Sequence, residues 1–390
     1  MRVLFATDWI GGGGVLSYLA AVMPALAARG HAVALLHDEA AGAEAAPPAE
    51  RRICAETLGR EEAAAAARAW APDVVFSHNL RPLELERALL AAGPVVKMMH
   101  AYAGTCIGGQ KTHLFPRAEP CGRRFGPACA ALYFTRRNGP ADPAYALREW
   151  RWAVEQRALF TRYAAVVTAS GHMRREFVRN GVPADRAHAI PLFSTLPAAP
   201  APVDAPEEFR VLFLGRMTRL KGGDLLLRAA ARAAAAAGRP VVVTLCGEGP
   251  QRAEWERLAA SLGVPAEFTG WAGEEERLAR IRAASLLAVP SVWPEPFGLV
   301  GLEAASQGVP AVAFDVGGIG EWLVDGVNGR LLPGRPRVEP LAEALARAAA
   351  HPAELAAMRP RALEAARRLS LDAHVGALER VLAAAAGGAA

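Results

Sequence analysis

Short apolar runs alternate with amphipathic helical segments along the first half of the chain. The runs are four to six residues long and show no strict alternation of apolar and polar positions. This pattern is typical of parallel strands that are buried on both faces, with helices as the crossovers between them. The pattern predicts strands at Val3–Thr7, Ala32–His37, Val74–Ser77, Val95–His100 and Val166–Ala169. The first half is therefore predicted to be a doubly wound α/β domain.

A change of composition divides the chain. Residues 191–208 read PLFSTLPAAPAPVDAPEE, with five prolines and no helical or strand period. Such a segment is predicted to be an exposed and fairly stiff linker. Strands with intervening helices or glycine turns are then predicted again, at Val211–Leu214, Val241–Leu245, Ala266–Thr269, Leu286–Val289 and Ala311–Phe314. A second doubly wound domain therefore follows the linker.

From Pro340 onward the pattern is helical, with breaks at His351 and Ser370. Ligands of parallel α/β sheets bind outside the carboxyl ends of the strands, so the cleft between two facing domains is the expected site. The expected parts are an N-terminal acceptor-side domain at 1–190, the linker at 191–208, a C-terminal nucleotide-sugar-binding domain at 209–368, and a C-terminal helix and tail at 369–390 that can pack back on the N-terminal domain.

Composition narrows the class of protein. The chain has 390 residues, of which 52% are hydrophobic and 21% charged, which is enough for two cores and excludes a disulfide-stabilised miniprotein or a disordered chain. The uncharged stretch Trp9–Ala28 contains four glycines and Pro24, so a strand, turn and helix explain it better than a signal peptide or membrane span. Five cysteines fit a reducing compartment. We therefore expect a cytoplasmic protein.

The charges are unevenly distributed. The chain has 44 Lys and Arg residues, and residues 111–186 hold 14 of them against six acidic residues. Such an excess attracts an anionic partner, which can be a phosphorylated acceptor, an acidic membrane surface or nucleic acid. A solvated basic face is the alternative. Aromatic residues Tyr133, Phe134, Trp150 and Trp152 are interleaved with the arginines, but no nucleic-acid-binding motif is present.

Glycines form the first predicted strand-to-helix turn. The run Gly11–Gly14 would let backbone amides approach an anionic group or a sugar at the start of a helix near Val15. The run does not satisfy G-x-G-x-x-G, because the sixth position falls on Leu16 or Ser17. This disfavours a dinucleotide dehydrogenase. A simple flexible turn is the alternative interpretation.

Two cations lie in the corresponding turn of the second half. In GRMTRLKGGDLLLRA, Arg216 and Lys221 lie between a predicted strand and a helix that begins at about Gly223. This is a natural place to hold a diphosphate. Lys221 is informative because this chain uses arginine for nearly all of its cations. A surface lysine beside helix-capping glycines is the alternative.

Two glutamates lie eight positions apart in WPEPFGLVGLEAASQG. Pro296 biases Glu295 out of the helical region, so its carboxylate is expected in a loop. The amides of residues 297–299 would then open a helix, with Glu303 one turn further along. Carboxylates accept strong hydrogen bonds from sugar hydroxyls and are costly in apolar surroundings without a partner. A partly buried salt bridge is the alternative for Glu303.

Several motifs together resemble the retaining, nucleotide-sugar-dependent glycosyltransferases of family 4. These motifs are GRMTRLKGG, LCGEGP, FTGW, EPFGLVGLEAASQGVPAVAFDVGG and DGVNGRLLP, in the order of the family. Gly13, Gly14 and the segment Gly30–Val33 extend the resemblance over nearly the whole chain. It implies the GT-B fold, in which two Rossmann-like domains face each other. It also implies hexosyl transfer from a nucleotide-diphosphate sugar to a hydroxyl acceptor, in polysaccharide, lipopolysaccharide or glycolipid assembly.

The resemblance also implies roles for individual residues, and Gly13 and Gly14 would contact the donor. Arg216 and Lys221 would hold the donor diphosphate, and Glu303 would bind the ribose. Glu295 would bind the transferred sugar together with the amides of Phe297, Gly298 and Leu299. The base would lie near Gly247, Gly249, Thr269, Gly270 and Trp271. His100 matches a histidine that the family places between donor sugar and acceptor, with a strand-end histidine in a loop network as the alternative. His100, Glu295, Arg216 and Lys221 are thus the expected catalytic set.

The resemblance implies no cofactor, because two cations and a helix terminus already face the diphosphate. Four residues resemble a cysteine-bearing subset of the family and offer a weak alternative, a structural zinc site: Cys106, His113, Cys121 and Cys129. Their spacings lack the tight pairs of structural zinc sites, and packed thiols are the other explanation. The expected partners are a nucleotide-sugar donor and a lipid-linked or otherwise anionic hydroxyl acceptor. We expect peripheral contact with the inner face of an acidic membrane and no nucleic acid.

Two further interpretations stay open. A GT-B nucleotide-sugar epimerase would need additional acid and base residues around the sugar. A non-catalytic protein could bind a nucleotide sugar, or bind nucleic acid through its arginine-rich middle. The pair of glutamates favours transfer.

Overall fold

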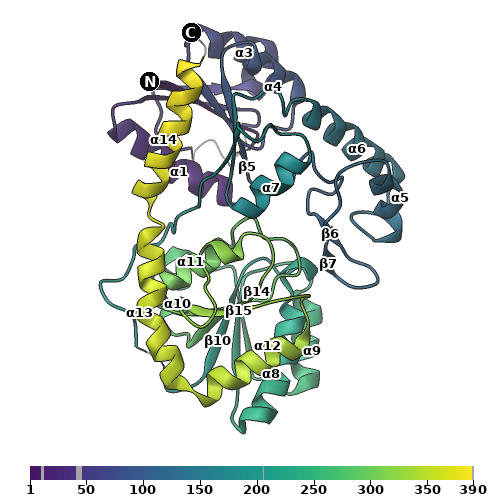
Figure 1. The fold of residues 1–390 in the computed structure, drawn as a ribbon, viewed down its shortest axis with the longest axis vertical. Coiled ribbons are helices and arrows are strands. Elements are labelled where there is room, and N and C mark those ends of the chain that lie inside the picture. Colours follow the sequence, from purple (N-terminus) through teal and green to yellow (C-terminus); the bar gives the residue numbers. More distant parts are fainter. Residues whose placement is uncertain (10–12, 41–45, 205, 389–390) are drawn as a thin grey trace. The chain divides into compact units, whose positions relative to one another are not determined.

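The chain folds into two compact units, which are drawn in Figure 1. This computed structural model describes residues 1–9, 13–40, 46–204 and 206–388, so Gly11 and Gly12 of the first glycine turn lie outside the described residues. Unit 1 comprises Met1–Lys111, Arg123–Leu192 and Leu371–Ala390, and unit 2 comprises Thr112–Gly122 and Phe193–Ser370.

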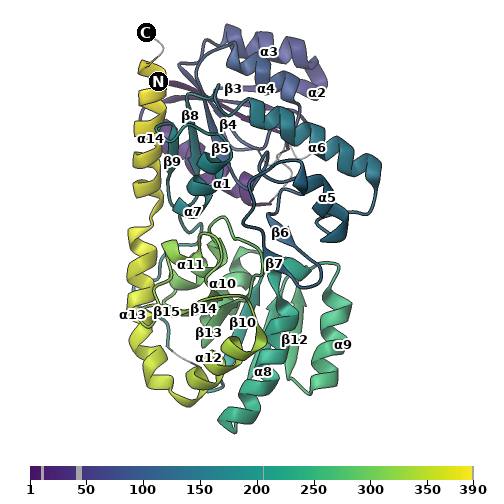
Figure 2. The same ribbon diagram turned by 45° about the vertical axis from the view of Figure 1, so that its right-hand side comes forward.

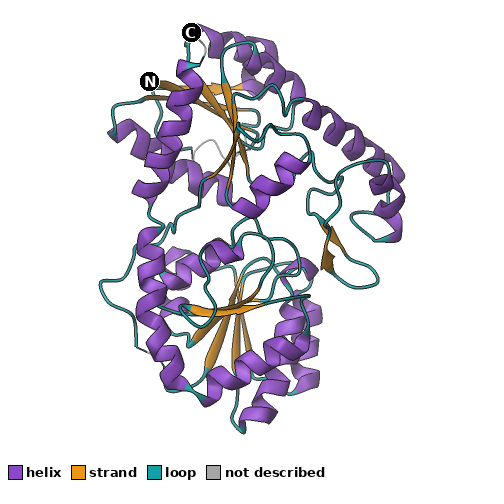
Figure 3. Cartoon of the chain, viewed as in Figure 1, coloured by secondary structure: helices purple, strands orange, loops and turns teal. Residues whose placement is uncertain are grey.

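Unit 1 is built on a parallel seven-stranded sheet with the order β3-β2-β1-β4-β5-β8-β9. Figure 3 draws the strands in orange, with helices around them in purple. Its strands are β1 (Arg2–Thr7), β2 (Ala32–His37), β3 (Arg51–Cys54), β4 (Val74–Ser77), β5 (Val95–Met99), β8 (Ala165–Thr168) and β9 (Ala187–Ala189). Five of these strands are almost fully buried along their length, as continuous apolar runs require. All five strands that the sequence pattern predicts for this half are present.

Helices cover both faces of this sheet. They are α1 (Gly13–Ala28), α2 (Ala55–Leu58), α3 (Arg60–Ala69), α4 (Leu83–Leu90), α5 (Ala128–Thr135), α6 (Pro143–Ala158), α7 (Gly171–Arg179) and α14 (Leu371–Gly387). Helices α1 and α14 lie side by side on one face, and α3 packs beside α4 on the other (Figures 1 and 2). The Tyr18 hydroxyl is 2.8 Å from His374 Nε2, and Arg29 pairs with Asp372 and Glu379. The helix α14 is therefore an integral part of unit 1.

Unit 2 is built on a parallel six-stranded sheet with the order β12-β11-β10-β13-β14-β15. Its strands are β10 (Arg210–Leu214), β11 (Val242–Cys246), β12 (Ala266–Gly270), β13 (Leu286–Val289), β14 (Ala311–Phe314) and β15 (Gly329–Leu332). The helices are α8 (Gly223–Ala237), α9 (Arg252–Leu262), α10 (Glu274–Arg282), α11 (Leu299–Ala305), α12 (Val338–Ala350) and α13 (Pro352–Arg368). Helix α8 packs against α9 and α12, while α11 packs against α13. The predicted second doubly wound domain is confirmed.

A short antiparallel pair, β6 (Thr112–His113) and β7 (Glu119–Pro120), belongs to unit 2 although it lies within the range that the sequence assigns to one N-terminal domain. Its base is held in unit 1 by Lys111, whose side chain is 2% exposed. The Lys111 ammonium pairs with Glu176 at 2.9 Å and donates to the carbonyl oxygen of Arg123. Lys111 precedes the segment 112–122 and Arg123 follows it, so one buried cation ties the two ends of this segment together.

Across the residues that the structure describes, none of the helices is both long and apolar enough to cross a membrane.

Candidate functional site

Three loops meet at the carboxyl edge of the unit 2 sheet. The amide of Met217 donates to the carbonyl oxygen of Glu248 at 2.7 Å, and the amide of Gly247 donates to that of Gly270 at 2.7 Å. A Cβ atom on Gly247 would lie 2.1 Å from the carbonyl oxygen of Gly215. Only glycine permits this approach, so the loops after β10, β11 and β12 form one continuous edge.

The residues that the sequence predicts around the nucleotide base lie on this edge. Gly249 has a φ of +156°, and a Cβ atom there would lie 2.4 Å from the carbonyl oxygen of Met217. Thr269 and Gly270 end β12, and the Trp271 side chain that follows is 79% exposed. A large exposed aromatic ring beside a tight glycine turn offers a flat apolar surface to a ligand.

The two predicted cations lie in the loop between β10 and α8. Arg216 is exposed and forms no ion pair with any described residue. Lys221 ends a short 3-10 turn, and Gly222 after it has a φ of +67° and packs on the carbonyl oxygen of Pro290. The Lys221 ammonium pairs with Glu295 at 2.7 Å. The structure thus brings Lys221 and Glu295 together, 74 residues apart in sequence.

Glu295 is held in a loop, as its flanking prolines predict. It is 4% exposed, and its Oε1 accepts a hydrogen bond from Ser291 Oγ at 2.5 Å in addition to that from Lys221. The carbonyl oxygen of Glu295 accepts from the amide of Gly318 at 2.7 Å. Sequence reasoning did not identify Ser291, although a polar residue just after β13 and four positions before the glutamate is a signal that could have found it.

Trp322 supports the start of α11, and it too was not predicted. Its Nε1 donates to the carbonyl oxygen of Phe297 at 2.7 Å, and the residue is 3% exposed. A Cβ atom on Gly301 would lie 2.0 Å from the indole ring. Gly298, with a φ of +85°, caps α11, which begins at Leu299. The loop of Phe297 and Gly298 is therefore fixed from behind by one buried ring.

Glu303 lies one turn into α11 and is 7% exposed. Its Oε2 is 3.6 Å from Arg277 Nε of α10, and its Oε1 is 3.5 Å from Thr195 Oγ1. Burial raises the pKa of Glu303, while the Arg277 charge opposes that rise. The partly buried salt bridge that the sequence left as an alternative is therefore present.

The carboxyl edge of the unit 1 sheet carries two histidines in contact. His100 directly follows β5, and its Nε2 is 2.9 Å from Nδ1 of His78, which follows β4. Burial lowers the pKa of His100 to about 4, and the nearby Lys97 charge adds to the effect. At the start of α1, Gly13 has a φ of +80°, which explains glycine there, and Gly14 has open space where a Cβ atom would lie.

The weak zinc alternative receives no support from this structure. Among the described residues, no three His, Cys, Asp or Glu side chains are grouped so that they could hold a metal ion. Cys106, Cys121 and Cys129 are free thiols, and His113 lies in β6.

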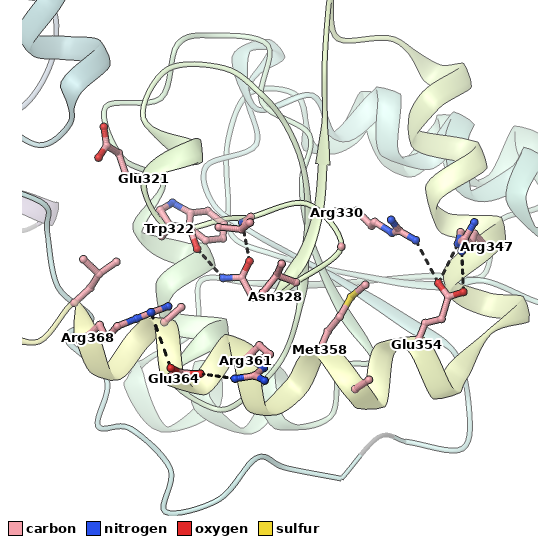
Figure 4. Close-up of a pocket in the computed structure, with 16 residues that line it drawn as sticks. Glu321, Trp322, Asn328, Arg330, Arg347, Glu354, Met358, Arg361, Glu364 and Arg368 are labelled. Carbon is pink, nitrogen blue, oxygen red and sulfur yellow. Dashed lines mark hydrogen bonds and ion pairs between the residues drawn. The ribbon is translucent and has the colours of Figure 1, made fainter.

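A pocket of about 1000 Å³ lies elsewhere on unit 2, between α13 and residues 321–330 (Figure 4). Its wall includes Trp322 but none of the residues predicted for the site. Its cations are paired: Arg330 and Arg347 contact Glu354, and Arg361 and Arg368 contact Glu364. Each of these arginines contacts a glutamate, so the pocket differs from the loop edge, where Arg216 forms no ion pair with a described residue.

Two doubly wound parallel sheets, with a cationic loop edge and an E-x7-E pair on the second, define a protein of the GT-B glycosyltransferase fold. Residues 200–366 match the family described as "Glycosyl transferases group 1", and residues 12–193 match "Glycosyltransferase Family 4". The chain belongs to glycosyltransferase family 4.

Curated relatives match part of the chain. A D-inositol 3-phosphate glycosyltransferase of Rhodococcus erythropolis is 42% identical over 171 residues, which cover 41% of this chain and 38% of the relative. A protein of the same name from Mycolicibacterium smegmatis is 42% identical over 132 residues, which cover 32% of this chain and 29% of the relative. The chain thus spans less than two fifths of the length of these relatives.

Solved structures match nearly the whole fold. Anabaena Alr3699/HepE in complex with UDP has a TM-score of 0.69 at 19% identity, over 98% of this chain and 100% of that one. Sucrose-phosphate synthase from Thermosynechococcus elongatus has a TM-score of 0.70 at 22% identity, over 99% of this chain and 100% of that one. At these identities the likeness shows the fold alone.

Proposed function

We propose that the chain is a retaining glycosyltransferase that moves a sugar from a nucleotide-diphosphate donor to a hydroxyl acceptor. The observation that carries the proposal is the loop edge of unit 2, where the Lys221–Glu295 pair lies beside tight glycine turns together with Arg216, which pairs with no described residue. The names of the relatives support it, as do the complexes of HepE with UDP and with UDP-glucose.

Each residue of this edge has a task in the proposal. Arg216 and Lys221 bind the two phosphates of the donor, so that Lys221 shares its charge between the diphosphate and Glu295. Ser291 keeps the Glu295 carboxylate oriented while that happens, and Glu295 accepts hydrogen bonds from the transferred sugar. Glu303 accepts hydrogen bonds from the ribose. No metal and no redox cofactor takes part.

The proposed chemistry is a displacement on one face of the sugar. The bond between the anomeric carbon and the diphosphate oxygen breaks, and a bond to the acceptor oxygen forms on the same face. The acceptor proton passes to the departing diphosphate oxygen, so the products are a glycoside and a nucleoside diphosphate. Arg216 and Lys221 stabilise the charge that develops on the leaving group.

A donor panel tests this proposal. We expect UDP, GDP or ADP, or a sugar ester of one of them, to raise the Tm with concentration, because a ligand that binds the folded state stabilises it. Arg216→Ala should abolish the shift. The exposed Arg232 on α8, which pairs with Glu339, supplies the matched control Arg232→Ala.

The products decide between the remaining functions. Release of nucleoside diphosphate that depends on an added hydroxyl acceptor supports transfer. An altered sugar still attached to its nucleotide indicates an epimerase. Binding without turnover of any donor indicates a non-catalytic protein, and a Tm unmoved by every nucleotide contradicts the donor site itself.

We further propose that unit 1 takes an anionic acceptor and meets the cytoplasmic face of an acidic membrane through α5 and α6. Apolar side chains on these helices are exposed: Phe134 by 46%, Leu147 by 50% and Val154 by 45%. Arg148 and Arg151 lie beside them, and 66% of the Arg148 side chain is exposed. Exposed apolar and basic side chains together are typical of helices that lie on anionic lipid.

Vesicle sedimentation tests this contact. Retention on phosphatidylglycerol-containing vesicles at low salt should fall steeply as salt is added, because each basic side chain near the surface contributes about 1 kcal/mol that ions screen. Arg148→Glu combined with Arg151→Glu should abolish retention, whereas Arg257→Glu on α9 should not. Equal retention on neutral vesicles, or none at low salt, contradicts the proposal.

A further inference from the structure

The buried partner of His100 carries an inference beyond the transfer reaction. His78 is fully buried, and its amide donates to the carbonyl oxygen of Ala6 at 2.8 Å, which extends the pairing of β1 and β4. Its ring packs against Phe76, whose centroid is 4.5 Å away, and against Phe5, which stacks nearly parallel at 5.8 Å. A ring packed in this way cannot turn, so the contact of its Nδ1 with His100 is fixed.

The two histidines share one proton between the nitrogens that face each other at 2.9 Å. Either His78 Nδ1 donates to His100 Nε2, or the reverse. The other nitrogen of His78, Nε2, is buried and has no hydrogen-bond partner among the described residues. If His100 were the donor, His78 would bury an unpaired N–H group there. If His78 is the donor, its Nε2 carries only a lone pair. Burying an unpaired lone pair costs less free energy than burying an unpaired N–H group, so His78 is the donor.

The surroundings keep both rings neutral. Burial lowers the pKa of His78 and of His100, and the Lys97 charge on β5 lowers both further. The groups that face the pair from α1 are aromatic: the Tyr18 ring lies edge-on to His100 at 5.7 Å. The hydroxyl of Tyr18 is turned to His374 of α14, where it donates to Nε2, because His374 Nδ1 must donate to the carbonyl oxygen of Pro191. Among the residues that the structure describes, no carboxylate is hydrogen-bonded to either ring.

We propose that His78 is a positioning residue that holds His100 as its Nδ1–H tautomer, so that His100 offers the substrate a hydrogen-bond donor and not a base. The inference rests on the proposed transfer reaction and deepens it. His100 is half-buried, and Nδ1 is the nitrogen that His78 leaves available. A donor at this place agrees with a reaction in which the departing diphosphate oxygen, and no side chain, takes up the acceptor proton.

Nitrogen NMR of the imidazoles tests the tautomer directly. In full-length protein labelled with 15N-histidine at pH 7, the His100 signals, assigned by their loss in His100→Gln, should show a protonated Nδ1 and an unprotonated Nε2. His78→Leu removes the donor, so His100 should change to a mixture of tautomers. His78→Asn places an amide N–H close to the former Nδ1 position and should restore the wild-type pattern.

Turnover should follow the tautomer. His78→Leu should lower kcat about 10-fold or more without changing the KM for the nucleotide sugar, and His78→Asn should recover most of the loss. The control is His37→Leu: His37 is also buried at the end of a strand of this sheet, but its Nδ1 contacts the carbonyl oxygen of Glu39. That variant should keep the wild-type His100 spectrum and kcat.

Three results would overturn the proposal. These are a His100 protonated on Nε2 in the wild type, a charged His100 at pH 7, and a His78→Leu variant with unchanged tautomer and kcat. The wild-type spectrum is decisive even if His78→Leu does not fold. Failure of the transfer reaction is distinguishable, because it appears as absence of turnover in wild-type protein whose His100 spectrum still shows the Nδ1–H form.

Discussion

Glu295 and Glu303 differ in their partners, and we expect their variants to fail differently. Glu295→Gln should leave the affinity for free nucleoside diphosphate intact, because it releases Lys221 for the phosphates, while turnover falls about 100-fold or more. Glu303→Gln should weaken nucleotide binding by about 1–3 kcal/mol, the size of a charge-assisted hydrogen bond. Calorimetric titration with nucleoside diphosphate and steady-state kinetics measure both. If Glu295→Gln weakens nucleotide binding and Glu303→Gln leaves it intact, the assignment of the sugar to Glu295 and of the ribose to Glu303 is wrong.

Single residues were predictable where local chemistry determines them. Prolines on both sides of Glu295 predicted its place in a loop, and that place is observed. Its pairing with Lys221 was not predictable, because it depends on Gly222 packing against Pro290, far along the chain. His78 was missed for a similar reason: a histidine after a strand looks unremarkable until the fold puts it against His100. The roles of all these residues remain predictions.

At the scale of elements, the fit of α11 against Trp322 gives a prediction. Gly301→Ala should destabilise unit 2 by about 2–3 kcal/mol, because the new methyl group would lie 2.0 Å from the indole ring. Trp322→Leu should cost at least as much through the lost packing and the lost hydrogen bond to Phe297. The double variant should cost clearly less than the two changes added together. Denaturant unfolding measures this coupling, and additive losses would contradict the contact.

Elements were predictable from the sequence where both faces of a strand are buried. All ten strands that continuous apolar runs predicted are present. The strands β3, β9 and β15 were missed, as was the short pair of β6 and β7, and each of them is an edge strand of its sheet. The sequences of β3, β9 and β15 are RRIC, AHA and GRLL, which carry polar residues toward solvent and lack the apolar run that marks a central strand.

For the whole molecule, the two units should respond oppositely to acid. In unit 1, burial lowers the pKa of His78, His100, His172, His188 and His374. A lowered histidine pKa gives stability that is present above about pH 6.5 and lost as pH falls toward the folded-state value. His100 alone, with its pKa of about 4, should cost on the order of 2 kcal/mol by pH 5.

In unit 2, burial raises the pKa of Asp224 and Glu303, so these groups favour folding as pH falls toward their unfolded values. Hydrogen exchange at pH 7 and pH 5, corrected for intrinsic rates, should therefore show loss of protection in unit 1 and none in unit 2. His188→Gln, at a partly exposed position, removes one of these histidines and should reduce the loss of protection in unit 1. Uniform loss across both units would contradict the assignment.

The linker and the alternation of elements predicted two α/β domains, but not which unit holds residues 112–122. Glu119 of this segment pairs with Arg335 of unit 2 at 3.4 Å, a contact between distant parts of the chain that leaves no periodic pattern in the sequence.

The place of α14 also bears on protein synthesis. Tyr18 is one of the early residues to leave the ribosome, whereas its partner His374 follows 356 positions later. In the folded protein α14 packs against α1 and against strands β4 and β5. Until α14 has been translated, the apolar side chains on this face stay exposed. Unit 1 is thus translated first but completed only after unit 2. Until α14 is made, the nascent unit 1 exposes an apolar face that a chaperone could protect.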